Sequence, residues 1–202
     1  MEKWALDTKL DAGTYDFQAI YGNENPVTLE IGFGMGDSLL QMAIDSPDRN
    51  FLGIEVHQAG VGRLLRLVEQ ENLCNLRVAC HDAVEILEHK IKPYKLQRVN
   101  IFFPDPWHKK KHNKRRLIQP QFLTLIHSRI KKEGLLHIAT DWGPYTEHIL
   151  KCIEQNKLFE NHSPDGHFVD RSSLGRPKTK FEKRGLKLGH EVFDMAFTPK
   201  RT

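Results

Sequence analysis

Short apolar runs alternate with amphipathic stretches over the first half of the chain. Runs rich in Val, Ile, Leu and Phe predict buried strands over residues 27–31, 51–56, 76–80 and 99–102. Between them, apolar side chains three and four positions apart predict helices over residues 37–46, 61–68 and 84–90. In the first of these helices we expect Leu40, Ala43 and Ile44 to be buried and Pro47 to end the helix.

The second half continues this alternation, with one long interruption. Residues 119–132 have helical spacing, residues 134–139 form an apolar run, and Pro144 suits the first turn of another helix. Residues 163–189 are rich in Gly, Pro, Lys and Arg and predict a long loop before a closing strand over residues 190–198. The pattern predicts an α/β fold with a doubly wound, mostly parallel sheet and helices on both faces. We expect one domain over residues 1–202, in which residues 1–25 form a mostly irregular arm.

Composition places the chain among globular proteins. Its 202 residues are 39% hydrophobic and 28% charged, which is enough for one sizeable core. The net charge of +4 does not by itself imply nucleic acid, so the clustering of charge has to carry that argument. The three cysteines form no CxxC pair, which fits a reducing cytosol. Because the chain shows neither a signal-peptide core nor an apolar run of ~20 residues, we expect a cytoplasmic protein that does not enter the membrane.

A glycine-rich turn follows the first strand, in the sequence Glu30-Ile31-Gly32-Phe33-Gly34-Met35-Gly36. Glycines at such a turn allow the backbone to approach a ligand closely. The pattern has Asp37 in place of the third glycine of a dinucleotide site and lacks the Gly-Lys-Ser/Thr of a P-loop, so a pyrophosphate ligand is disfavoured. Glu30 would repel a phosphate and attract a cation such as S-adenosylmethionine, which carries a sulfonium and an ammonium group. The alternative is a tight turn with a surface glutamate.

Two more acids stand at the ends of the next two strands. Glu55 lies about twenty residues past the glycines, where an acid typically accepts hydrogen bonds from ribose hydroxyls. Asp82 follows the third strand, from which a side chain can reach an adenine amino group, although an aspartate there is often only a helix cap. Together with Glu30, these acids favour a nucleoside-binding site more strongly than any one of them does.

Residues 103–116 combine an acid, an aromatic ring and a dense run of cations, in the sequence FPDPWHKKKHNKRR. Asp105 stands between two prolines, which stiffen the loop that leaves the fourth strand. Trp107 offers a flat face for a base, and the following Lys and Arg residues suit a phosphate backbone. A turn followed by a solvated basic face is the simpler reading, but the three features at one strand end favour a functional site.

These features together resemble the bacterial tRNA (guanine-N7)-methyltransferases. The resemblance runs in order from about Leu29 to Gly185 without a large gap, and residues 1–25 match poorly. Its motifs PDPWxKxxHxKRR and TKFExRG are long and specific. The segments that carry it are residues 30–36, 53–57, 103–107, Lys109, His112, 114–116, 140–142 and 179–185.

The resemblance implies a Rossmann-like class I methyltransferase fold, with a seven-stranded sheet and an antiparallel last strand. The implied reaction transfers a methyl group from S-adenosylmethionine to N7 of the guanine at variable-loop position 46 of tRNA. Its products are 7-methylguanosine and S-adenosylhomocysteine. No metal and no obligatory protein partner are implied, and we expect a monomer because no exposed apolar face stands out.

The resemblance also implies roles for single residues. Asp105 is implied to be catalytic. Cofactor contacts are implied at Glu30, Gly32, Gly34, Gly36, Glu55, Asp82 and Asp105. Substrate contacts are implied at Lys109, Asp141, Thr179, Lys180, Phe181 and Glu182. Two points stay open, because Glu182 can pair with a base edge or with Arg184, and Asp141 can read the base or cap the following helix.

Three other readings remain. His108 and His112 have the spacing of a helical metal site, but the lysines between them would repel a cation, so we expect no metal. A methyltransferase of a protein side chain or a small amine would keep the cofactor site without needing the basic run. A non-catalytic RNA-binding module would keep the fold, but the set of Glu30, Glu55 and Asp82 argues against it.

Overall fold

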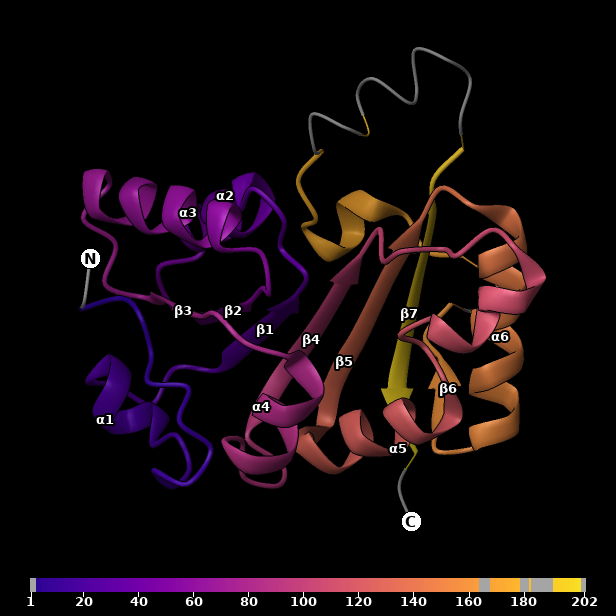
Figure 1. Ribbon diagram of the computed structural model, residues 1–202, viewed down its shortest axis with the longest axis horizontal. Helices are drawn as coiled ribbons and strands as arrows, with labels where there is room; N and C mark the ends of the chain where they lie inside the picture. Colours follow the sequence, from indigo (N-terminus) through magenta and orange to yellow (C-terminus); the bar gives the residue numbers. More distant parts are fainter. Residues whose placement is uncertain (1–2, 164–167, 179–181, 183–190, 201–202) are drawn as a thin grey trace.

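The computed structural model describes residues 3–163, 168–178, 182 and 191–200, and a seven-stranded sheet forms its centre (Figure 1). The strand order is β3-β2-β1-β4-β5-β7-β6, and β7 is antiparallel to both of its neighbours. The strands are β1 (Val27–Ile31), β2 (Asn50–Ile54), β3 (Leu76–Ala79), β4 (Leu96–Phe102), β5 (Ile130–Thr140), β6 (Phe159–Asn161) and β7 (Phe193–Pro199). This confirms the predicted Rossmann-like, mostly parallel sheet with an antiparallel last strand.

Helices cover both faces of the sheet, as predicted. Apolar residues of α2 (Asp37–Asp45) and α3 (Gln58–Gln70) form one core cluster with β2 and β3. The other face packs against α4 (Ala83–His89), α5 (Pro120–Arg129) and α6 (Gly143–Asn156) in a second cluster. The chain builds β2 and β3 on one side of β1 and then returns to place β4 on the other side. This reversal of strand order creates a crevice at the carboxyl ends of β1 and β4.

The N-terminal arm is more ordered than its weak periodicity predicts. It contains α1 (Phe17–Tyr21), which Asp16 caps by accepting hydrogen bonds from two backbone amides. Ala5 forms a parallel bridge with Val78, and the Trp4 and Tyr15 side chains are buried. The arm therefore covers the outer edge of β3, a contact that depends on long-range pairing and leaves no local pattern.

Several boundaries and one helix face differ from the predictions. Strand β5 begins at Ile130 because Leu96 pairs with it, although the following Lys131, Lys132 and Glu133 suit a helix locally. In α2 the buried apolar residues are Leu39, Met42 and Ala43, while Ile44 is 40% exposed. The expected face of α2 was therefore wrong by about one residue. The short strand β6, and η2 (Arg171–Leu174) in the expected long loop, also went unpredicted from periodicity.

Candidate functional site

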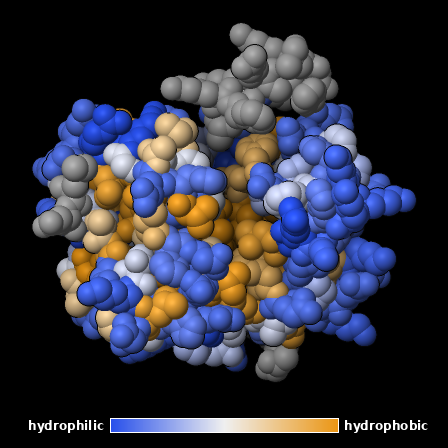
Figure 2. Space-filling model, in the orientation of Figure 1, coloured by the Kyte–Doolittle hydropathy of each residue, from blue (hydrophilic) through white to orange (hydrophobic). Residues whose placement is uncertain are grey.

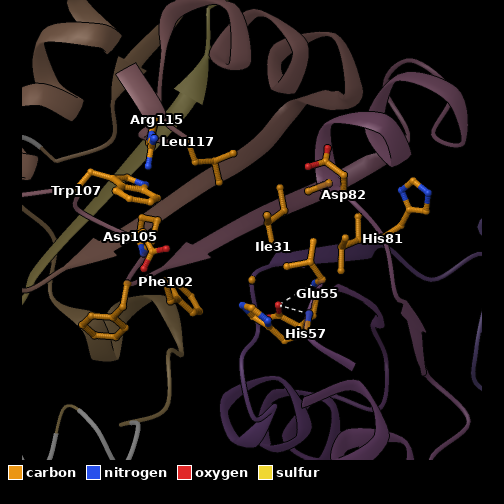
Figure 3. Close-up of a pocket in the computed structure, with 16 residues that line it drawn as sticks. Ile31, Glu55, His57, His81, Asp82, Phe102, Asp105, Trp107, Arg115 and Leu117 are labelled. Carbon is orange, nitrogen blue, oxygen red and sulfur yellow. Dashed lines mark hydrogen bonds between the residues drawn. The ribbon is translucent and has the colours of Figure 1, made fainter. Parts of the chain in front are cut away.

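A cleft of about 410 Å³ opens at the carboxyl ends of β1, β2, β3 and β4. In Figure 3, Asp105, Trp107 and Arg115 lie on one side of it and Glu55 and Asp82 lie on the other, with Ile31 between them. Figure 2 shows that hydrophobic residues gather in the hollow at the middle of this face, with mostly hydrophilic residues on its right and a mixture of hydrophilic and hydrophobic residues on its left. The cleft therefore combines an apolar floor with acidic residues at its rim.

Glu55 organises the glycine-rich turn from inside the protein. Its side chain is 6% exposed, and it accepts hydrogen bonds from the backbone amides of Gly34 (2.9 Å), Val56 (2.8 Å) and His57 (3.0 Å). A carboxylate has about four acceptor positions, so these three bonds leave one for a ligand. The turn itself needs glycine, because the φ angles of Gly32, Gly34 and Gly36 are all positive. Of these three glycines, Gly32 lines the cleft.

Asp82 caps a helix and also lines the cleft. Its Oδ1 atom accepts hydrogen bonds from the backbone amides of Val84 (2.8 Å) and Glu85 (3.2 Å) and so caps α4. The residue also lines the cleft, opposite Asp105. The cap fixes the carboxylate at this position, and its predicted contact with an adenine stays a prediction.

Glu30 does not line the cleft. It is 2% exposed and pairs in register with Asn100 on β4, which in turn pairs with His137 on β5. Its Oε2 atom has no hydrogen-bond partner among the described residues. Burial raises the pKa of Glu30 to about 8, and the nearby Arg98 and Arg176 reduce this rise. Glu30 is thus a buried acid beneath the glycine-rich turn, and its predicted contact with the cofactor stays a prediction.

Asp105 is held on a tightly constrained loop and keeps its carboxylate exposed. Phe103 and Trp107 on either side of it have φ angles of 51° and 45°, which non-glycine residues rarely adopt. The backbone amide of Phe103 donates to Ala139 on β5 (2.7 Å), and the buried Arg116 donates to the carbonyl of Pro106 (2.8 Å). Among the described residues, none forms a hydrogen bond with the Asp105 carboxylate, so both of its oxygens remain available to a ligand.

The basic run divides into structural and exposed cations. Arg116 is 5% exposed, with its guanidinium over the Tyr145 ring, and Arg115 lies over the Trp107 ring. Arg115 is nevertheless exposed, as are Lys109, Lys110, Lys111 and Lys114, and all of these except Lys109 lie on the 3-10 helix η1 (Lys110–Arg115). The expectation that every cation from Lys109 to Arg116 faces phosphates was therefore wrong for Arg116.

A second hollow of about 370 Å³ adjoins the same loop. It is lined by Asp105, Pro106, Trp107, His108, Lys109 and His112. Asp105 is thus common to this hollow and to the larger cleft. Asp105, the predicted catalytic residue, and Lys109, a predicted substrate contact, therefore line the same hollow.

The other predicted substrate residues lie on two further elements. Asp141 follows β5 and does not cap α6, since the N-cap residue of that helix is Trp142 and no side chain caps it. Glu182 is 4% exposed and its two oxygens accept hydrogen bonds from Arg176 (2.7 and 3.1 Å). Arg184, the partner considered from the sequence, lies outside the described residues, as do Thr179, Lys180 and Phe181.

One group of buried polar and charged side chains was not predicted from the sequence, and it consists of Arg98, His137, Arg176 and Asp194. The guanidinium of Arg98 lies 2.7 Å from Nδ1 of His137, and Nε2 of His137 lies 2.7 Å from Asp194. Because a guanidinium only donates, Nδ1 must accept and Nε2 must carry the proton. Burial lowers the pKa of His137 to about 4, which keeps the ring neutral. The signal in the sequence that could have predicted this group is the presence of polar residues inside the apolar runs of β5 and β7.

No cluster of three or more His, Cys, Asp or Glu side chains suited to a metal ion occurs within the described part of the chain. In the same residues, no helix is both long and apolar enough to cross a bilayer.

Comparisons with known proteins agree with this geometry. The family described as "Putative methyltransferase" matches residues 24–195. The tRNA (guanine-N(7)-)-methyltransferase of Photorhabdus laumondii is 51% identical over 192 residues, which cover 95% of this chain and 80% of that protein. The enzyme of the same name from Escherichia coli is 53% identical over 182 residues, covering 90% and 76%. The solved structure of the 16S rRNA methyltransferase KamB matches with a TM-score of 0.69 at 12% identity, over 93% of this chain and 95% of that one.

The seven-stranded sheet and its structural match define the Rossmann-like class I fold, and the family match over residues 24–195 makes the chain a methyltransferase of that fold. The identity of about one half, over nearly the whole chain, goes further. The chain belongs to the family of tRNA (guanine-N7)-methyltransferases.

Proposed function

We propose that this chain transfers a methyl group from S-adenosylmethionine to N7 of a guanine in tRNA, giving 7-methylguanosine, and that the guanine is the one at variable-loop position 46. The observation that carries the proposal is the position of Asp105, an unpaired carboxylate among the described residues that borders both the cleft and the hollow beside the basic loop. Family membership supports the same reaction.

The residues of the cleft fit S-adenosylmethionine. The cleft volume of about 410 Å³ falls in the usual range for small-molecule sites, roughly 300–1,000 Å³. Glu55 keeps one acceptor position for a ribose hydroxyl, and Asp82 lies at the rim with only its Oδ1 atom occupied by the cap of α4. The apolar side chains of Ile31, Phe102 and Leu117 supply surfaces against which an adenine can pack.

The chemistry asks the protein mainly for alignment. When bound, S-adenosylmethionine supplies an electrophilic methyl group on a sulfonium. The guanine N7 is an unprotonated lone pair, so no general base has to free it, and in-line placement of the reacting atoms provides most of the acceleration. Positive charge develops on the guanine ring as the bond forms. The Asp105 carboxylate stabilises that charge, and its free oxygens also suit the N1–H and 2-amino edge of guanine.

The target base has to leave its helix before it reaches Asp105. In A-form RNA the deep, narrow major groove hides N7 from side chains, so the base must be unstacked, at a cost of a few kcal/mol. Trp107 is the proposed stacking partner. Its ring already carries the guanidinium of Arg115 at 5.1 Å, so a base that stacks on that face has to displace Arg115.

Replacement of Asp105 tests the proposal most economically. Asp105→Asn keeps the size of the side chain and removes its charge, so we expect the single-turnover methylation rate at saturating tRNA to fall about 100-fold. The dissociation constant of S-adenosylmethionine, measured by calorimetry, should change by less than about tenfold. The exposed Glu147→Gln on α6 is the matched control. A rate that survives Asp105→Asn would reduce Asp105 to a turn residue.

We also propose that the protein works as a monomer in the cytoplasm, as a single domain and without an obligatory protein partner. The large exposed apolar side chains of the described residues lie on separate elements, among them Ile44 on α2 and Tyr94 before β4. Sedimentation of the protein alone and with tRNA tests this, because a concentration-dependent dimer would contradict it.

A further inference from the structure

Arg176 is a buried cation between two carboxylates. It is 1% exposed, and it donates to both oxygens of Asp194 (2.7 and 2.8 Å) and to both oxygens of Glu182 (2.7 and 3.1 Å). Its pKa is raised, because these hydrogen bonds outweigh the effect of burial. Such four-point contact fits the planar fork of a guanidinium and no other side chain.

The same guanidinium packs against the two aromatic residues that precede Asp105 in the chain. Its central carbon lies 5.5 Å from the ring centroids of both Phe102 and Phe103. These two residues come directly before Pro104 and Asp105, and Phe103 has the left-handed φ of 51°. A residue in that region costs on the order of 1 kcal/mol and persists only where its surroundings hold it. Arg176 is one of the groups in contact with Phe103.

The charges around Arg176 anchor it to the sheet. Asp194 lies on β7 and also accepts a hydrogen bond from Nε2 of His137 on β5 (2.7 Å). Although burial raises the pKa of Asp194, the bonds from His137 and Arg176 lower it below the ordinary value, so the carboxylate stays charged. The guanidinium is therefore fixed to Asp194 on β7, which is itself bonded to β5. It also packs against the two aromatic rings at the end of β4.

We propose that Arg176 is a positioning residue for methyl transfer: clamped by Asp194 and Glu182, it fixes the Phe102–Phe103 turn and through it the place of Asp105. The expected effect on the methylation rate rests on the proposed function. The expected effect on the Phe102–Phe103 turn rests only on the contacts of Arg176. It assigns Glu182 the role of a clamp on Arg176, in addition to any contact with substrate.

A double-mutant cycle separates positioning from general stability. Arg176→Met should lower the single-turnover rate about tenfold or more when Asp105 is present, because small displacements of a reacting group are costly. In the Asp105→Ala background the same change should lower the remaining rate less than about twofold, since nothing is left to position. The cofactor dissociation constant should stay close to that of the parent protein in both backgrounds.

Two further variants keep the test sound. Arg176→Lys retains the charge between the carboxylates, so it folds even where Arg176→Met does not, but it cannot bridge four oxygens and should still slow the reaction. Arg77→Met is the matched control. Arg77 is also buried over an aromatic ring and bonded to backbone carbonyls, yet it lies on β3, away from the cleft-lining residues. Its loss should reduce stability and leave the rate of the folded protein unchanged.

Amide hydrogen exchange gives a readout that needs no activity. In Arg176→Met or Arg176→Lys, peptides that contain Phe103, Asp105 and Trp107 should exchange faster, whereas peptides of β1 and β2 should keep their protection. Unchanged exchange around Asp105, or an equal rate loss in both backgrounds of the cycle, would overturn the positioning role. Failure of the wild-type protein to produce 7-methylguanosine would instead overturn the proposed function, and the exchange experiment would still decide the role of Arg176.

Discussion

Asp105 and Glu55 are both carboxylates at strand ends, but they differ in their hydrogen bonding within the protein. The Glu55 carboxylate accepts hydrogen bonds from three backbone amides, whereas none of the described residues forms a hydrogen bond with the Asp105 carboxylate. The sequence predicted the positions of both acids because strand ends are visible as the ends of apolar runs. It could not predict which acid would be occupied, because the amide of Gly34 approaches Glu55 only after β1 and β2 have paired.

Glu30 gives a residue-scale prediction about pH. Its pKa is about 8 in the folded protein and about 4.5 when unfolded, so between these values the folded state binds more protons. Stability therefore falls as pH rises from about 5 to 9, by on the order of 4 kcal/mol from this group. Glu30→Gln cannot lose a proton, so the stability of this variant relative to wild type should increase with pH.

Urea unfolding of both proteins at pH 5 and pH 9 measures this difference directly. The exposed Glu71→Gln serves as the control, for which the difference from wild type should stay flat. A Glu30→Gln difference that is equally flat would mean that Glu30 ionises as readily in the folded protein as in the unfolded chain.

At the scale of elements, residues 103–116 form a loop whose shape depends on a few internal contacts. Arg116 binds the Pro106 carbonyl and Arg115 covers Trp107, so two cations of the basic run maintain the loop. The sequence predicted the loop from its prolines and its position after β4. It could not separate structural from exposed cations, because that division depends on the 3-10 turn of η1 and on Tyr145 from α6.

The exposed lysines of η1 should bind phosphate in proportion to their charge. Replacing Lys110 and Lys111 with alanine should weaken tRNA binding and lower the slope of log affinity against log salt by about 1 to 2. The matched control is the double variant Lys92→Ala, Lys95→Ala, which changes two exposed lysines just before the start of β4. Titrations from about 50 to 200 mM salt measure both slopes, and equal slopes for the two double variants would count against binding through this loop.

At the scale of the whole molecule, the strand order determines where function gathers. Glu55, Asp82 and Asp105 follow β2, β3 and β4. They are 27 and 23 residues apart in sequence, yet all three line one cleft. Alternating strands and helices predict this convergence, because the carboxyl ends of parallel strands share one edge. The clamp of Arg176, Asp194 and Glu182 could not be predicted in this way. It joins a loop to the antiparallel β7, and periodicity does not specify that pairing.

The most direct test of the central claim is methyl transfer from labelled S-adenosylmethionine to unmodified tRNA, followed by nucleoside analysis. We expect the label in 7-methylguanosine, and its loss when the guanine at variable-loop position 46 is replaced by adenine in an otherwise identical tRNA. Label in 7-methylguanosine from both tRNAs would keep the reaction and reject the position. Label in another nucleoside, or none in tRNA while the cofactor still binds, would contradict the proposed reaction.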